Sequence, residues 1–275
     1  MFKIYDLNMK ELPFPEGVKP LDIFVSSVNK RRLTEEFEGR SGTLNYGYDY
    51  GERSVDLSLW LEAHDTIDYR LIRNELYAFF DAHDVFYIEE TRVPSRVLKV
   101  TIDESYIPER INQTHSSVEI SCRTLDSVFW ESKYTTLELH DSGYSATAEK
   151  YGLVDNIDDE KVKYRFTESN FTVYNAGNVT VEPESMYLRI IASEVTSSNN
   201  FTIRNKTTGD EFVLKRESNG SHVRLIGMVA SMGSITNIFR DTNRRFIRLA
   251  PGDNEFEILN GTFAQISIDF KNYYK

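Results

Sequence analysis

Residues 39–63, GRSGTLNYGYDYGERSVDLSLWLEA, join a glycine-rich polar stretch to a strictly alternating one. In the alternating part every second side chain is apolar, and the positions between them are polar or tryptophan. A period of two is typical of a strand that buries one face, so this part predicts a half-buried β-strand. The apolar positions are Val55, Leu57, Leu59 and Leu61.

The glycine-rich part of this stretch could be a ligand-cradling loop, a carbohydrate platform or a structural hairpin. It precedes a strand and not a helix, so it does not fit the dinucleotide-binding fingerprint. Its tyrosines lack the convergent polar side chains that accompany a sugar site. We therefore interpret its glycines as turn and bulge positions at positive φ, which shape a long hairpin.

One helix is predicted directly after the strand, over residues 66–82. Asp65 or Thr66 can cap its N-terminus, and Asp68 suits the positive end of its dipole. Apolar side chains at helical spacing form a single stripe, which we expect to pack on a sheet or on a neighbouring subunit. The stripe consists of Ile72, Leu76, Phe79 and Phe80, widened by Tyr69 and Leu71.

Almost all of the remaining chain is predicted to be β. Short alternating runs fill the second half and are separated by turn signals such as TTGD (207–210) and PGDN (251–254). This spacing without helices favours a β-sandwich or jelly roll. A change of composition between the halves indicates an arm or linker. We expect domains at 1–135 and 161–275, joined by a linker at 136–160.

The charge of the chain is unevenly distributed around a net value of −11. Residues 1–150 hold 17 Lys and Arg against 27 Asp and Glu, a net charge of −10, and residues 151–275 hold 15 against 16, a net charge of −1. This argues against a nucleic-acid-binding face on the first half, because phosphate contacts need clustered cations. No stretch approaches the roughly 20 apolar residues that span a bilayer, so we expect no membrane insertion.

No pattern of catalytic or metal-binding residues stands out in the sequence. The five histidines are scattered, and there is no GxSxG elbow or P-loop. Cys122, the single cysteine, alternates with Val118 and Ile120, which indicates a buried structural thiol. We predict no enzyme activity, no cofactor and no metal. A carbohydrate-binding protein and a glycosidase stay open as alternatives, although Trp60 and Trp130 both lie in the first half.

The order of several motifs along the chain resembles the distal tail protein (Dit) family of siphophages, the bacteriophages with long, non-contractile tails. The likeness covers nearly the whole chain and rests on the order and spacing of its motifs. In the first half these are LDIFVSSV (21–28), GRSGTLNYG (39–47), YGERS (50–54), HDTIDYRLIRNEL (64–76) and VEISCRTLDSVFW (118–130). In the second half they are FTVYNAGN (171–178), FTIRNKTTGDEFVL (201–214) and LAPGDNEFEI (249–258).

The resemblance implies a mainly β fold: an N-terminal β-sandwich or split-barrel domain with one α-helix, and a C-terminal galectin-like β-sandwich of jelly-roll type. It implies a homohexameric ring that joins the tail tube protein to the tail-tip protein. DNA would pass through the channel without specific binding, and the second domain would attach receptor-binding or baseplate proteins. The protein would be made in the bacterial host cytoplasm and reside in the virion, at the tail tip, without catalysis or cofactor.

On this resemblance the hairpin residues become candidates for contacts between subunits. An acidic first half would also suit a DNA channel, because like charge keeps phosphates from adhering within a screening length of about 8 Å. The alternative is a carbohydrate-binding adhesion module of the tail tip that contacts host cell-wall glycans. The candidate ring contacts are Gly39, Gly42, Tyr46, Gly47, Tyr48, Tyr50 and Gly51. The candidate core residues are Leu57, Leu59, Leu61, Ile72, Leu76, Phe80 and Trp130.

Overall fold

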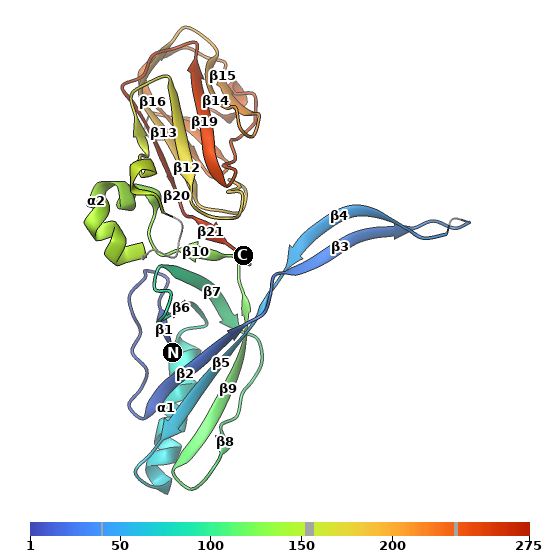
Figure 1. The fold of residues 1–275 in the computed structure, drawn as a ribbon, viewed down its shortest axis with the longest axis vertical. Coiled ribbons are helices and arrows are strands. Elements are labelled where there is room, and N and C mark those ends of the chain that lie inside the picture. The colour runs from blue at the N-terminus through green and yellow to red at the C-terminus, as the bar shows by residue number, and fades with distance from the viewer. Residues whose placement is uncertain (40, 152–156, 234–235) are drawn as a thin grey trace. The chain divides into compact units, whose positions relative to one another are not determined.

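The chain divides into two compact β-rich units, coloured from blue to green and from green to red in Figure 1. The computed structural model describes residues 1–39, 41–151, 157–233 and 236–275. Unit 1 comprises Met1–Trp130 together with Lys275, and unit 2 comprises Glu131–Tyr274. None of the helices in these described ranges is long and apolar enough to cross a membrane.

Unit 1 is built on an antiparallel sheet with the strand order β1-β6-β7-β9-β5-β2. A short strand, β8 (Glu109–Arg110), pairs with β9 along the edge opposite to β5. Strand β5, next to the edge strand β2, is the alternating segment of the sequence, and it pairs with β2 on one side and β9 on the other. The strands are β1 (Phe2–Tyr5), β2 (Val18–Val25), β5 (Ser54–Glu62), β6 (Val85–Glu90), β7 (Arg96–Ile102) and β9 (His115–Thr124).

The period of two in β5 is confirmed, because its apolar face is completely buried. Leu57, Leu59 and Leu61 have no exposed surface, whereas the side chains between them are partly exposed. Cross-strand neighbours on β9 continue the same face, with Ile120 opposite Leu57 and Val118 opposite Leu59. Burial of such aliphatic side chains contributes roughly 1.5–3 kcal/mol each, so this face is a main source of stability in unit 1.

The predicted helix is confirmed as α1 (Thr66–Ala82). Asp65 is its N-cap, and the carboxylate accepts hydrogen bonds from the backbone N–H groups of Ile67 and Asp68 at 2.7 and 2.8 Å. The expectation for Leu71 was wrong: it is 57% exposed, because it lies on the face of α1 turned away from the core. The buried residues of the helix are Tyr69, Ile72, Leu76 and Phe80.

The core of unit 1 lies between α1 and the sheet and includes every core candidate of the sequence except one. Trp130 packs against this core but is only partly buried. Cys122 is buried in the core, and its burial raises the pKa of its thiol to about 12. The thiol is therefore protonated and shielded, as a structural cysteine should be.

Unit 2 contains a six-stranded antiparallel sheet, β11-β20-β13-β16-β17-β18, and a four-stranded one, β12-β19-β14-β15. Each sheet buries one alternating face, as Ile190 and Val223 show in the larger sheet and Ile203 and Phe212 in the smaller. The mainly β character expected from the sequence is thus confirmed. The larger sheet comprises β11 (Arg165–Phe166), β20 (Gln265–Phe270), β13 (Leu188–Ser197), β16 (Ser218–Ile226), β17 (Val229–Met232) and β18 (Thr236–Asn237). The smaller comprises β12 (Asn170–Asn175), β19 (Gly252–Leu259), β14 (Phe201–Asn205) and β15 (Asp210–Leu214).

Helix α2 (Thr136–Tyr151) occupies most of the segment for which the sequence predicted an arm or linker and no helix. Gly143, at φ +75°, interrupts the helix. Tertiary contacts fix its first turn, since the Thr136 hydroxyl accepts a hydrogen bond from the backbone N–H of Phe270 at 3.0 Å. The backbone N–H of Leu137 donates to the Asp269 carboxylate at 3.1 Å. Such distant partners leave no periodic signal in the sequence.

The remaining short elements are η2 (Asp159–Lys161), η3 (Phe239–Asp241), β10 (Trp130–Ser132) and β21 (Tyr273–Tyr274). The TTGD turn is confirmed, because Asn205 pairs with Asp210 where it joins β14 to β15. The turn predicted over residues 251–254 was wrong in extent, since β19 already begins at Gly252. An isolated antiparallel bridge joins Val181 to Leu249 outside the named strands.

Candidate interaction site: the β3–β4 hairpin

Strands β3 (Asn29–Glu36) and β4 (Thr43–Gly51) form a two-stranded sheet of their own, drawn in blue outside the main sheet in Figure 1. Its pairing contains one irregularity. Arg32 lies opposite Tyr48 and Thr34 opposite Asn45, so Tyr46 and Gly47 both oppose the single residue Leu33. Two residues facing one define a β-bulge, and Gly47 adopts a φ of +118° there.

The bulge separates three tyrosines that alternate in the sequence. In a regular strand Tyr46, Tyr48 and Tyr50 would share one face, because alternate residues point the same way. The extra residue at Gly47 instead turns Tyr46 to the opposite face, where its hydroxyl donates a hydrogen bond to Glu35 at 2.9 Å. This hydrogen bond raises the pKa of Tyr46.

The face of the hairpin that carries Tyr48 and Tyr50 is packed against other side chains near the root. The rings of Tyr48 and Tyr50 meet edge to face, with centroids 5.4 Å apart, and Tyr50 packs in the same way on Phe129 at 5.1 Å. The ammonium of Lys30 lies 4.6 Å from the centroid of Tyr48. Tyr50 therefore packs the root of the hairpin against Phe129 in the rest of unit 1, while Tyr48 remains exposed.

Beyond this root the hairpin is solvated, and every residue of β3 is exposed. Leu33, Phe37 and Tyr46 are exposed apolar side chains, and Tyr46 exposes 59% of its surface. An isolated two-stranded ribbon is marginally stable in water, and its outer edges offer unpaired backbone groups. The exposed apolar side chains of this ribbon make it a candidate surface for contact with another protein.

Charge divides the hairpin into two parts. Lys30, Arg31 and Arg32 follow one another near the root, where Asp49 lies opposite Arg31, whereas three glutamates of the first arm lie toward the turn. The acidic tip of the hairpin consists of Glu35, Glu36, Phe37 and Glu38, with the phenylalanine 45% exposed. The hairpin thus presents an acidic and aromatic end.

The expected positive φ holds for three of the four glycines. Gly39 and Gly42, in the turn, adopt φ values of +83° and +93°, and Gly47 forms the bulge. For Gly51 the expectation was wrong, because this residue lies in the regular ladder opposite Asn29. No Cβ clash excludes a side chain at Gly39, Gly42 or Gly47, so the backbone conformation is what requires glycine there.

Arg53 was not among the candidate residues of the sequence. It lies in the segment that follows β4, and it links this segment to the one that precedes β3. Its guanidinium donates to the backbone carbonyl of Ser26 at 2.8 Å and to that of Val128 at 3.3 Å. Its backbone N–H donates to the hydroxyl of Thr124 at 3.0 Å. Burial lowers the pKa of this arginine. Its place in the YGERS motif was the only signal in the sequence.

The described part of the chain shows no group of three His, Cys, Asp or Glu side chains that could hold a metal ion. Trp60, one of the two tryptophans, lies on β5, and its ring centroid is 5.7 Å from that of His115. The arrangement that stands out is the hairpin, which offers backbone edges, apolar side chains and charge for binding another protein surface.

Residues 15–122 match the family model described as the phage tail protein RIFT-related domain. This segment contains the hairpin, β5 and α1. This part of the chain is therefore similar to the phage tail RIFT-related domain family.

The fold of the whole chain is that of a solved phage protein, the Dit protein (gp 19.1) of phage SPP1. The match covers 100% of both chains with a TM-score of 0.69 and 11% sequence identity. That structure is described as a paradigm of the hub adsorption apparatus in phages that infect Gram-positive bacteria. Chains in two structures of the activated phage p2 baseplate, with Sr and with Ca, match at TM-scores of 0.44 and 0.45 and identities of 9% and 10%, covering 98% of this chain and 97% of theirs. No curated protein gives a significant sequence match.

Proposed function

We propose that this protein is a distal tail protein, a structural hub in the tail of a siphophage. Six copies form a ring that joins the tail tube to the tail tip, and DNA passes through its channel. The observation that carries the proposal is a solvated hairpin with exposed apolar side chains on a phage tail domain. The protein is made in the bacterial cytoplasm and becomes part of the virion, and it needs no catalytic residue or cofactor.

The hairpin suits a ring because ring closure needs one surface on each copy and a different, complementary surface on the next. Such head-to-tail contacts close when the rotation between neighbours repeats. The ring contacts come from Tyr46, Tyr48 and the turn between β3 and β4. The turn glycines Gly39 and Gly42 shape this end of the hairpin. An obligate interface of this kind buries more than about 2,000 Å² in total, so other surfaces of unit 1 contribute.

Unit 2 suits the outward domain of such a hub. Its sheets of six and four strands, each with one buried face, support a β-sandwich of galectin-like jelly-roll type. In this position it provides attachment for baseplate or receptor-binding proteins. Unit 1 corresponds to the ring-forming β-sandwich or split-barrel domain, and its acidic character keeps DNA from adhering where carboxylates face the channel.

Negative-stain electron microscopy of the purified protein, alone and mixed with the tail tube protein, tests the proposal. We expect rings of six copies, and light scattering should give a mass of about six chains. Because such rings can need a partner for assembly, the decisive sample is the mixture. A protein that stays monomeric with the tube protein present would overturn the hub assignment.

A second candidate function is carbohydrate binding at the tail tip. Unit 2 has a groove of about 480 Å³ whose lining includes Phe166, Tyr174, Lys161 and Asp253. Aromatic rings beside charged groups suit a sugar, although Lys161 lies over the Tyr174 ring at 4.8 Å and is paired with Asp253 at 2.8 Å. A monomer that binds specific glycans on an array would favour this function, and rings without glycan binding would exclude it.

A further inference from the structure

The sequence contains two Asn-Gly pairs, Asn219-Gly220 and Asn260-Gly261, and both lie in unit 2. Asparagine is one of the thermolabile residues of proteins, and it reacts fastest before glycine, where no side chain shields the next backbone nitrogen. We propose that Asn219 is a site of spontaneous deamidation in the folded protein, whereas the fold protects Asn260. This chemistry goes beyond the proposed function and does not depend on ring assembly.

Deamidation needs only the chain itself and water. The backbone nitrogen of the following residue attacks the side-chain carbonyl carbon of asparagine and closes a five-membered succinimide ring. The bond between that carbon and the side-chain nitrogen breaks, and ammonia leaves with the proton of the attacking nitrogen. Water then opens the ring at one of its two carbonyls, which gives aspartate or isoaspartate. The reaction therefore requires a backbone that can bend toward the asparagine side chain.

Asn219 lies at an irregularity in the pairing of β16 with β13. It is opposite Thr196, but the next paired residue of β16 is Ser221. Gly220 is therefore the extra residue of a bulge, outside the regular ladder, and it adopts a φ of +70°. Asn219 and Gly220 are both exposed, and beyond the adjoining residues no atom lies within 4 Å of the position of a Cβ on Gly220. The backbone of this pair thus has room to bend.

The side chain of Asn219 donates a hydrogen bond to the Glu217 carboxylate at 3.1 Å. Both residues are exposed, so water competes for this bond and its net contribution is small. Conversion of Asn219 to aspartate would place a second carboxylate beside Glu217, and attraction would become repulsion. Isoaspartate would also lengthen the main chain where β16 pairs with β13, which destabilises unit 2. In the virion of the proposed function no chain is renewed, so the modified form would accumulate as the particle ages.

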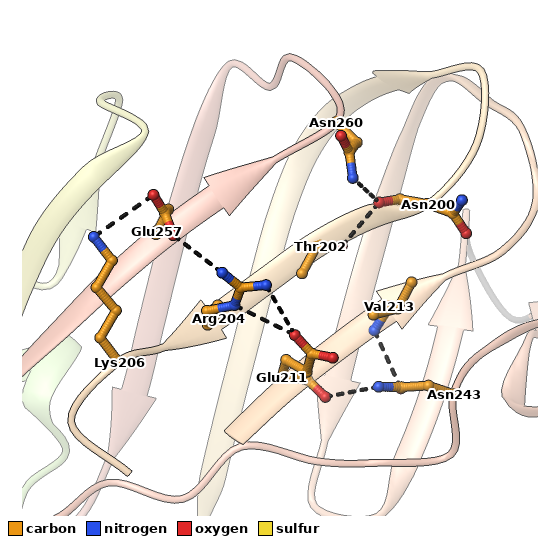
Figure 2. Close-up of polar contacts among 9 residues, drawn as sticks. All are labelled: Asn200, Thr202, Arg204, Lys206, Glu211, Val213, Asn243, Glu257 and Asn260. Carbon is orange, nitrogen blue, oxygen red and sulfur yellow. Dashed lines mark hydrogen bonds and ion pairs between the residues drawn. The ribbon is translucent and has the colours of Figure 1, made fainter. Parts of the chain in front are cut away.

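Asn260 is also exposed, but hydrogen bonds hold both its side chain and its backbone. Figure 2 shows its side-chain amide donating to the backbone carbonyl of Asn200, at 3.0 Å. The same carbonyl accepts a hydrogen bond from the Thr202 hydroxyl at 2.9 Å. The backbone carbonyl of Asn260 accepts another from the hydroxyl of Ser197. The amide of Asn260 is therefore held on Asn200 and away from the reaction.

The glycine that follows Asn260 is confined as well. A Cβ on Gly261 would lie 2.9 Å from both the Phe201 ring and the carbonyl oxygen of Thr196. Phe201 is completely buried, and Thr262 exchanges two backbone hydrogen bonds with Thr196, each of 2.9 Å. Bending of this backbone would break packing and hydrogen bonds, so the reaction at Asn260 waits for local unfolding. The surroundings of the glycine, and not exposure of the asparagine, distinguish the two pairs.

Incubation of the folded protein at pH 8, followed by peptide mapping with mass spectrometry, tests the site. We expect Asn219 to convert roughly tenfold or more faster than Asn260, with isoaspartate among the products. In denaturant the two pairs should react at similar rates, because only their neighbours in sequence remain. Equal rates in the folded protein, or an equally large preference in denaturant, would overturn the inference. Neither result would bear on the proposed hub.

The variant N219Q gives a second measurement. Glutamine would have to close a six-membered ring, which is much slower, and the exposed position lets N219Q fold as the unaltered chain does. After equal incubation we expect the melting temperature of unit 2 to fall in the unaltered protein and to hold in N219Q, while Asn260 reacts alike in both. An equal loss of stability in the two proteins would show that the damage lies elsewhere and would overturn the assignment of Asn219.

Discussion

The Tyr46 hydroxyl donates to Glu35 across the β3–β4 hairpin, on the face opposite Tyr48 and Tyr50. A single residue, Gly47, causes this arrangement by opening a bulge opposite Leu33. The hairpin consequently presents aromatic side chains on both faces. A surface that is aromatic on both faces can be enclosed between neighbours, which suits an arm in a ring.

Gly47→Val should disturb this arrangement. A β-branched residue at a φ of +118° costs on the order of 1–3 kcal/mol, so the bulge should shift and Tyr46 should lose its bond to Glu35. We expect faster amide hydrogen exchange in β4 and fewer rings by electron microscopy, with unit 2 unchanged. Thr34→Val is the matched control, because it places the same side chain at an exposed position of the hairpin that is paired with Asn45 and has no bulge residue of its own. Equal ring yields from both variants would show that the bulge is not needed for assembly.

Two leucines on α1 offer a matched test of the core. Leu76 is completely buried, and Leu76→Ala should lower the free energy of unfolding of unit 1 by about 2–5 kcal/mol. Leu71 exposes 57% of its surface on the same helix, so Leu71→Ala should change this free energy by no more than about 0.5 kcal/mol. Urea denaturation followed by tryptophan fluorescence measures both. Similar losses for the two variants would contradict the assigned orientation of α1.

The thiol of Cys122 should be inert in the folded protein. Burial raises its pKa to about 12, so at pH 8 nearly all of it is protonated as well as inaccessible. A disulfide reagent at pH 8 should find no reactive thiol in the native protein and one per chain in denaturant. Rapid labelling without denaturant would show that this strand opens readily.

Asn254 should be essential for the stability of unit 2. Its buried amide donates to the carbonyls of Ala250 and Gly252 at 2.8 and 3.0 Å and accepts from the Asn205 side chain at 3.1 Å. Asn254→Ala leaves several buried polar groups unpaired, each costing about 1–3 kcal/mol, so we expect a loss of about 3 kcal/mol or more. Asn199→Ala, at an exposed position, is the control. Calorimetry should show a lower melting temperature for the unit 2 transition alone.

Features that depend on neighbours in the sequence could be predicted from it. The alternation in β5 and the capped, striped helix α1 were predicted correctly, because strand and helix periods repeat within a few residues. Helix α2 was missed because its first turn is held by partners on β20, more than 130 residues away. Arg53 was missed for the same reason, since Ser26 and Val128 surround it only in the folded chain.

The candidate site, too, was predicted from the sequence only in part. By itself, the sequence determined that a glycine-rich hairpin with three tyrosines precedes the central strand, and that the leucines of this strand face the core. Only the tertiary structure decided which face each tyrosine occupies, because the register of a bulge depends on the pairing of two strands.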